Sequence, residues 1–268
     1  SAFKIFGYYN TKKGQTLSVS VLMYHHILPK SSFISSSVSE FEAQMAYLAR
    51  CGYKTLSLEE FFLYKKAKLK VPKKSVLITF DDGWRDNFYF AYPILKRYNL
   101  RASIFLVTSW VQKASEQKAE FSPCSHSQCK KIVPNEPGRV VLNWDEIAQM
   151  RDICDFASHT HTHGDDYFGS YDFASDLGLC KKIMKTRLGI DDSVLCWPRG
   201  NFDEIRLNIA KNLGYELFFT TKRGINRPDG ICDDVRRIAV KNGAQWLRKI
   251  LFIYQNDVFG RLYGLVKG

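Results

Sequence analysis

The sequence lacks any apolar run long enough to cross a membrane, although 45% of its 268 residues are hydrophobic. A membrane-spanning helix needs about 20 consecutive apolar residues, so we expect none. A recognisable signal peptide is also missing from the start of the chain. The seven cysteines are odd in number and have no regular spacing, which favours reduced thiols over a disulfide framework. These absences predict a cytoplasmic protein, at most at the inner face of the membrane. A leader removed beforehand would instead make it periplasmic or secreted.

Patterns typical of nucleic-acid-binding modules are absent as well. No zinc-finger, RNP or helix-turn-helix pattern occurs, so we expect no nucleic-acid partner despite the net charge of +12. The positive charge still indicates an anionic partner. A phosphate-bearing glycolipid or the anionic face of a membrane fits that charge better than a nucleic acid does.

What the chain does contain is an apolar run that ends in two carboxylates. Residues 75–80 are rich in β-branched and aromatic side chains, which predicts a buried strand. Asp81 and Asp82 follow directly, and adjacent carboxylates repel each other and are costly to bury. A metal ion removes that cost if one carboxylate binds it and the other stays free as a base. A surface Asp-Asp-Gly turn is the alternative.

A second feature is a cluster of histidines after another strand-like run, residues 155–158. Three of the six histidines, His159, His161 and His163, lie within five residues. Because His159 and His163 are four positions apart, a helical turn or a tight loop would bring both to one side and point His161 elsewhere. Imidazole is a common zinc ligand, and two histidines with one aspartate are typical of a hydrolytic metal site. A histidine-rich surface turn is the alternative.

A third strand-like run, residues 193–196, leads into Trp197-Pro198-Arg199-Gly200. Because proline has no N–H group, the N–H of Arg199 is the first backbone donor after it. A donor at a strand tip can stabilise an oxyanion.

These three stretches, in this order, resemble the motifs of the polysaccharide deacetylases, the NodB-homology family or carbohydrate esterase family 4. Residues 79–83 match the first motif of the family residue for residue, and residues 159–163 match the second, His-Ser/Thr-x-x-His. Residues 197–200 resemble the third, which is usually Arg-x-Pro-Tyr-Gly. The resemblance covers about residues 20–240. It implies an α/β fold, a distorted (β/α)7 barrel with its site at the C-terminal ends of the strands.

The resemblance also implies a reaction, the metal-dependent hydrolysis of the N-acetyl group of an amino sugar in a glycan or a lipid-linked sugar. Asp82, His159 and His163 would hold a divalent metal, zinc in the first place, with cobalt, nickel or iron as alternatives. Asp81 would be the catalytic base, and the backbone N–H of Arg199 would stabilise the oxyanion.

The sequence departs from the family pattern in three places. Cys196 stands where an arginine often stands, and Arg199 replaces the usual tyrosine. The late Leu-x-His motif, which normally supplies the general acid, is missing, since no histidine follows His163. Met23-Tyr24-His25 matches an N-terminal motif of the poly-N-acetylglucosamine deacetylase branch, so the resemblance assigns the acid role to His25.

Further site residues follow from their positions beside the motifs. The last predicted strand, residues 234–240, contains Arg236 and Arg237. Arg237, or failing that Arg236, would pair with Asp81 and keep it ionised, although both are equally consistent with surface charges. Three residues next to the motifs are predicted to contact the substrate: Tyr24, Trp197 and Pro198.

Strand-like and helix-like segments alternate along the chain. About seven strands are expected, and the candidate residues follow them, which favours parallel strands with right-handed crossovers and a barrel. We divide the chain into an N-terminal extension (1–17), a deacetylase domain (18–245) and a C-terminal amphipathic tail (246–268). The first part of the tail is expected to be a helix that packs on the domain. For the end of the tail, packing on the core is favoured, and binding to a membrane surface is the alternative.

Two local expectations inside the domain are specific enough to check. Ser39 to Glu42 have the spacing of a capping box, which predicts the start of a helix. Residues 109–138 are polar and are expected to be an irregular loop insertion, either functional or mobile. Cys124, His126 and Cys129 in this insertion lack further ligands for a second zinc site, so free thiols or a disulfide are expected.

Three other functions remain open on the sequence alone. The chain could remove a different acyl group, including a formyl group from a lipid-linked sugar. It could bind carbohydrate without catalysis, although the intact Asp81, Asp82, His159 and His163 oppose this. A nucleic-acid-binding module, suggested by charge alone, would bind generic DNA with a steep salt dependence.

Overall fold

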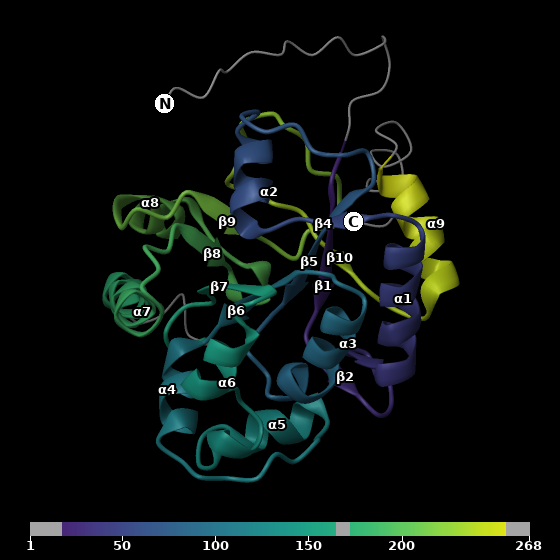
Figure 1. Ribbon diagram of the computed structural model, residues 1–268. Helices are drawn as coiled ribbons and strands as arrows, with labels where there is room; N and C mark the ends of the chain where they lie inside the picture. Colours follow the sequence, from purple (N-terminus) through teal and green to yellow (C-terminus); the bar gives the residue numbers. More distant parts are fainter. Residues whose placement is uncertain (1–17, 165–171, 256–268) are drawn as a thin grey trace.

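The computed structural model describes residues 18–164 and 172–255, and parallel strands form a curled sheet at its centre (Figure 1). The strands of this sheet are β1 (Ser20–Tyr24), β4 (Lys54–Thr55), β5 (Ser75–Phe80), β6 (Ala102–Leu106), β7 (Cys154–Ser158), β8 (Val194–Cys196), β9 (Leu217–Phe219) and β10 (Ile238–Ala239). Their order is β10-β1-β5-β6-β7-β8-β9, and β4 pairs with β5. A parallel bridge between Phe219 and Val235 links β9 to the segment ahead of β10. The sheet therefore curls into a partly closed barrel.

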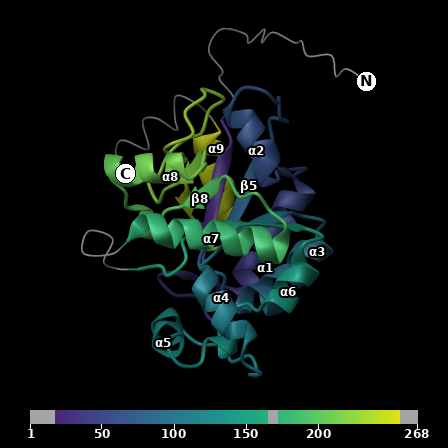
Figure 2. The same ribbon diagram turned by 90° about the vertical axis from the view of Figure 1, so that its left-hand side faces the viewer.

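Helices surround the sheet, as crossovers between parallel strands require. They are α1 (Val38–Arg50), α2 (Leu58–Lys65), α3 (Tyr92–Arg97), α4 (Thr108–Ser115), α5 (His126–Ile132), α6 (Trp144–Met150), α7 (Phe173–Leu188), α8 (Glu204–Asn212) and α9 (Ala244–Tyr254). Shorter elements are η1 (Asn87–Ala91), η2 (Pro137–Arg139), η3 (Pro198–Gly200) and the strand pair β2 (His26–Leu28) and β3 (Ser35–Ser37). Helices α7 and α8 lie on the side of the sheet away from α1 and α9 (Figure 1), and this side faces the viewer in Figure 2. The predicted α/β fold and its distorted barrel are confirmed.

The strand side chains alternate between two apolar cores. Leu22 and Ile78 belong to the core that the outer helices cover, whereas Val21 and Leu77 belong to a second core. This period of two is the pleat of a strand that is buried on both faces. Phe61 of α2 is part of the second core, so α2 packs against the inward side of the strands.

Helix α1 begins two residues earlier than its sequence pattern suggests. The N-cap is Ser37, whose Oγ accepts a hydrogen bond from the backbone N–H of Glu40, while the Glu40 carboxylate accepts one from the N–H of Ser37 at 2.9 Å. The prediction that the capping box starts at Ser39 is therefore wrong. Both serines have a glutamate three positions later, and only Ser37 has the extended backbone at the end of β3 that a cap requires.

The segment 109–138 is more regular than expected. It contains most of α4, all of α5 and the turn η2, so the expectation of an irregular loop is wrong over these elements. Buried Val111 and Ala114 attach α4 to the main core, and buried Cys129 attaches α5. All seven cysteines are free, which excludes the disulfide alternative for Cys124 and Cys129 here.

The C-terminal helix packs on the domain as predicted. Leu247 and Leu251 of α9 are fully buried in the main core. The predicted N-terminal extension and the end of the tail, residues 256–268, lie outside the described residues. Within residues 18–164 and 172–255, no helix is both long enough and apolar enough to cross a membrane.

Candidate active site

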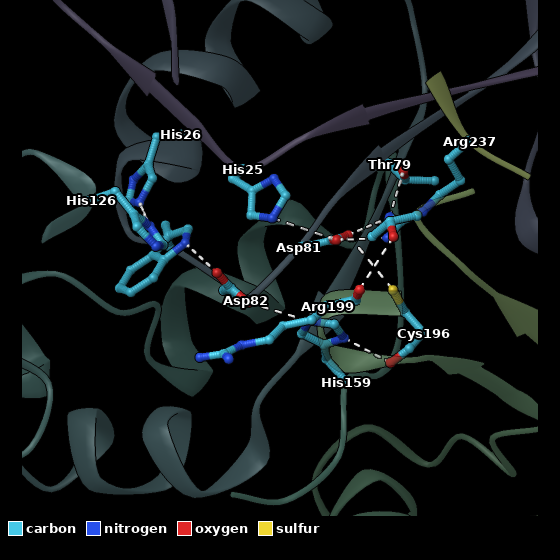
Figure 3. A network of polar contacts seen from close by, with 12 residues as sticks. His25, His26, Thr79, Asp81, Asp82, His126, His159, Cys196, Arg199 and Arg237 are labelled. Atoms are coloured by element: carbon cyan, nitrogen blue, oxygen red, sulfur yellow. Dashed lines mark hydrogen bonds and ion pairs between the residues drawn. The ribbon is translucent and has the colours of Figure 1, made fainter. Parts of the chain in front are cut away.

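The register of the parallel strands brings the sequence motifs together. Tyr24 of β1 pairs with Phe80 of β5, and β6 and β7 continue the same parallel sheet. The residues that follow β1, β5 and β7 are therefore at one edge of the sheet, and Figure 3 shows His25, Asp81 and His159 facing a common centre.

Three of the predicted metal ligands converge on one point. The Oδ1 atom of Asp82 lies 3.2 Å from Nε2 of His159 and 3.4 Å from Nε2 of His163. The three ligand atoms lie within 4.8 Å of one another, and the three side chains are at most 8% exposed. Two imidazole nitrogens and a carboxylate oxygen are a donor set that suits a zinc-like ion and leaves positions open for water and substrate. The residues present therefore fit the implied metal.

The partners of the histidines support this arrangement. Nδ1 of His159 lies 2.8 Å from the carbonyl oxygen of Cys196, so the N–H on Nδ1 points there and leaves Nε2 to face Asp82. His161 turns away from the centre, and its Nδ1 lies 2.9 Å from Oγ1 of Thr108. The sequence spacing had predicted this separation of His161 from the other two.

The loops that hold the ligands have an unusual backbone. Asp82 (φ 75°), Thr160 (φ 66°), His163 (φ 53°) and Arg199 (φ 57°) all adopt the left-handed region, which is costly for residues other than glycine. Such strain persists where surrounding contacts enforce it and is concentrated at functional sites. Four residues in three site loops therefore share a conformation that hydrophobic patterns do not reveal.

Asp176 is a structural part of the site that the sequence analysis missed. Its carboxylate accepts hydrogen bonds from the backbone N–H groups of His161 at 2.8 Å and Thr162 at 3.0 Å. These bonds hold the loop between the two histidine ligands. Asp176 lies in the first turn of α7, after the segment 165–171, and no spacing rule links it to the histidine motif.

Asp81 forms a buried ion pair with Arg237. The guanidinium binds both carboxylate oxygens, with Nη1–Oδ1 at 2.5 Å and Nη2–Oδ2 at 2.8 Å, and its Nε donates to the carbonyl oxygen of Thr220. Burial alone would raise the pKa of Asp81, but the charge and hydrogen bonds of Arg237 lower it below its usual value. Arg236, the alternative partner, instead lies 3.4 Å from Asp234. The pair keeps Asp81 ionised.

His25 approaches the same carboxylate from the other side. Its Nε2 lies 3.7 Å from Oδ2 of Asp81, and 18% of its side chain is exposed. Burial lowers the pKa of His25, against the opposing charges of Asp81 and Asp82. The arrangement therefore combines a metal-ligand group, an ionised carboxylate and a second proton carrier.

Comparison with known proteins decides the family. The model of the polysaccharide deacetylase family matches residues 68–218, which is more than half of the chain. The chain belongs to the polysaccharide deacetylase family. Members of this family are hydrolases that act on N-acetylated sugars.

Individual relatives agree with this assignment. YxkH of Bacillus subtilis is 26% identical over 87% of this chain and 75% of its own length. The poly-β-1,6-N-acetyl-D-glucosamine N-deacetylase of Escherichia coli K12 is 24% identical, but its match covers 78% of this chain and only 34% of the relative. Among solved structures, the Streptococcus pyogenes deacetylase PplD, in complex with acetate, has a TM-score of 0.75 at 23% identity, over 88% of this chain and 99% of that one.

One departure from the family motifs has a structural explanation in this deacetylase. The Sγ atom of Cys196, at the position where the family often has an arginine, lies 3.8 Å from Oδ1 of Asp81. Arg237, from the other end of the chain, supplies the cation instead. Asp81, His159 and Cys196 also form a second group of possible metal ligands. Because Arg237 binds both Asp81 oxygens, the Asp82 group fits a metal better.

The predicted substrate-contact residues of this deacetylase are buried. Trp197 is 1% exposed and stacks on Phe218 and on two other aromatic rings, and Pro198 is buried beside it. Tyr24 is 3% exposed, and its hydroxyl donates to Oε1 of Gln44. These contacts give the side chains a packing role, and their contact with substrate stays a prediction. The side chain of Arg199, in contrast, is exposed.

Proposed function

We propose that this protein is a metal-dependent deacetylase that hydrolyses the N-acetyl group of an amino sugar in a glycan or glycolipid. The observation that carries the proposal is the convergence of Asp82, His159 and His163 beside an ionised Asp81. Membership of the polysaccharide deacetylase family supports the same reaction. Zinc is the first choice of metal because the donor set mixes imidazole nitrogen with one carboxylate.

Asp81 is the base in this proposal. A divalent ion held by Asp82, His159 and His163 would polarise the acetyl carbonyl and acidify a water molecule. Asp81 accepts a proton from that water, which then attacks the carbonyl carbon. Arg237 keeps the carboxylate ionised and fixes its plane, so that Asp81 is ready to accept the proton.

His25 and Arg199 act on the other atoms of the amide in this proposal. The backbone N–H of Arg199 stabilises the negative charge that develops on the acetyl oxygen. His25 gives a proton to the leaving nitrogen as the C–N bond breaks, so that acetate and an amine are the products. Its neutral resting state, which burial favours, requires that it first gain a proton, and Asp81 lies 3.7 Å away as a source.

Charge and relatives support the class of substrate. The Escherichia coli relative is described as acting on poly-β-1,6-N-acetyl-D-glucosamine, which supports N-acetylglucosamine as the sugar. The net charge of +12 supports an acceptor that carries negative charge, such as a lipid-linked sugar at an anionic membrane face. We therefore place the reaction in the biosynthesis of a cell-envelope glycan.

The test is acetate release from N-acetylated glycans by metal-stripped protein, with and without added zinc or cobalt. We expect release that depends on the metal and falls at least about 100-fold in Asp82→Ala, because a ligand is lost. His161→Ala is the matched control, since His161 faces Thr108 rather than the centre. It should retain metal binding and activity within a few-fold.

Other outcomes separate the alternative functions. Release of formate, but no acetate, from N-formylated lipid-linked sugars would move the activity to a deformylase. Carbohydrate binding that is unchanged in Asp81→Asn, with no acyl release from any variant, would indicate a non-catalytic relative. A wild-type protein that binds no metal would contradict the proposed mechanism itself.

A further inference from the structure

The two carboxylate oxygens of Asp82 have different partners. Oδ1 faces Nε2 of His159 and of His163. Oδ2 accepts a hydrogen bond of 2.9 Å from the indole N–H of Trp84, which is fully buried. Trp84 follows Asp82 by two residues, across a glycine with φ 78°. The side chain of Trp84, which follows the Asp-Asp-Gly turn, therefore folds back onto Asp82.

The indole of Trp84 is itself held in place from behind. Its ring stacks on the buried ring of His26, with centroids 4.5 Å apart and an angle of 24° between the planes. Nδ1 of His26 lies 2.6 Å from Oδ2 of Asp86, and its Nε2 lies 3.1 Å from Nδ1 of His126. Figure 3 shows His26 next to His126. Both ring nitrogens of His26 are thus fixed by hydrogen bonds, and the ring cannot turn without breaking them.

This support extends to the segment inserted between β6 and β7. His126 is the first residue of α5, and the edge of its ring also meets Trp84, with centroids 5.7 Å apart. Trp110 of α4 lies 5.5 Å from Trp84 and 5.3 Å from His163, measured between ring centroids. Helix α4 therefore contacts the ligand His163 through Trp110, whereas α5 is linked to the metal-ligand group through Trp84.

We propose that Trp84 is a positioning residue for Asp82, and that His26, Asp86 and His126 hold its indole in place. The inference rests on the proposed metal-dependent function. A carboxylate that rotates freely presents either oxygen, or both, to an ion. Because the indole N–H holds Oδ2, only Oδ1 is turned toward the two histidines, and the ligand group needs no rearrangement before it binds a metal.

The direct test is the zinc dissociation constant of metal-stripped protein, measured by competition with a chromophoric chelator. Trp84→Phe removes the N–H donor but keeps an aromatic ring for stacking on His26. We expect its zinc affinity to fall about 10- to 100-fold, the range typical for partners of metal ligands. Trp144→Phe is the matched control, because Trp144 lies in α6 against Arg187. It should bind zinc as tightly as the wild type.

A second variant and a second readout test the support of the indole. His126→Gln leaves Trp84 and Asp86 in place, and we expect a smaller loss of zinc affinity, about 2- to 5-fold. The side-chain ¹⁵N–¹H spectrum of the five tryptophans reports on the fold, and the Trp84 signal should move when zinc binds. Equal zinc affinity of wild type and Trp84→Phe, with both folded and acetate release intact, would overturn this inference alone. A wild type that binds no zinc would overturn it together with the proposed function.

Discussion

At the scale of single residues, the ion pair of Asp81 and Arg237 sets the protonation of the proposed base. Both side chains are buried, at 2% and 0% exposure. Arg237→Gln removes the charge and the hydrogen bonds that oppose the effect of burial most strongly, so the pKa of Asp81 rises and a smaller fraction of the carboxylate is ionised at a given pH. We expect kcat/KM at pH 7 to fall at least about 100-fold, and the acid limb of its pH profile to move to higher pH. Rates of acetate release between acidic and neutral pH check this.

The neighbouring arginine provides the control for that experiment. Arg236→Gln removes an equal charge one residue away, from a side chain that lies 3.4 Å from the carboxylate of Asp234, and should leave the pH profile unchanged. Arg237→Lys keeps the charge but loses the two-point contact, so we expect a smaller shift of the acid limb. Arg237→Gln leaves a buried carboxylate unpaired, which costs about 3 kcal/mol or more and threatens folding. Because Arg237→Lys keeps the positive charge, it provides a result even if Arg237→Gln does not fold. Coinciding profiles for folded Arg237→Gln and wild type would show that Arg237 does not tune Asp81.

The sequence could not decide which of these two arginines pairs with Asp81. The motif residues Asp81, Asp82, His159 and His163 are identifiable from sequence. Within each of the two motifs they are close together in the chain, and their combination is chemically unusual. Arg236 and Arg237 are adjacent and identical, so their roles depend only on which side of the strand each one faces. A one-residue change of register reverses that choice, and the register is fixed by pairing of β10 with β1.

At the scale of elements, the cap of α1 offers a test of helix boundaries. Ser37→Ala removes the hydroxyl that accepts from the N–H of Glu40, and we expect the free energy of unfolding to fall by about 1 kcal/mol. Ser39 is the second residue of the helix and not its cap, so Ser39→Ala should change this free energy by less than about 0.5 kcal/mol. Urea denaturation of the two variants measures the difference. The reverse order would mean that α1 begins at Ser39.

The predicted elements and the unpredicted elements are stabilised in different ways. Strands such as β5 can be recognised from their own sequence, because five of its six residues are apolar or β-branched, and all six are buried. Helices α4 and α5 have eight and seven residues, too short to be stable by themselves. Their stability comes from tertiary contacts such as those of Trp110 and His126 with Trp84. A polar segment with contacts of this kind is easily interpreted as an irregular loop.

At the scale of the whole molecule, the barrel explains why distant motifs could be assigned to one site. Parallel strands place their C-terminal ends at the same edge, so the residues after β1, β5 and β7 meet although more than a hundred positions separate His25 from His159. Tyr24 and Trp197, which lie next to motif residues in the sequence, are buried and packed against neighbouring side chains. Closeness to a motif in the sequence does not specify whether a side chain faces the site or the core between sheet and helices.

The charge of the whole molecule leads to a prediction about substrate capture. With 39 basic and 27 acidic residues, the protein attracts anions over about 10 Å at 0.1 M salt and over less at higher salt. For a phosphate-bearing, lipid-linked N-acetylated sugar, we expect kcat/KM to fall about 10-fold as salt rises from about 20 to 200 mM. For a neutral N-acetylated oligosaccharide it should change less than about two-fold. Initial rates of acetate release for both substrates, at one pH, measure the effect. If the two rates respond equally to salt, the charge does not select the acceptor. If the rate on a partly deacetylated, cationic glycan rises with salt, the positive charge of the protein repels a product that carries amines.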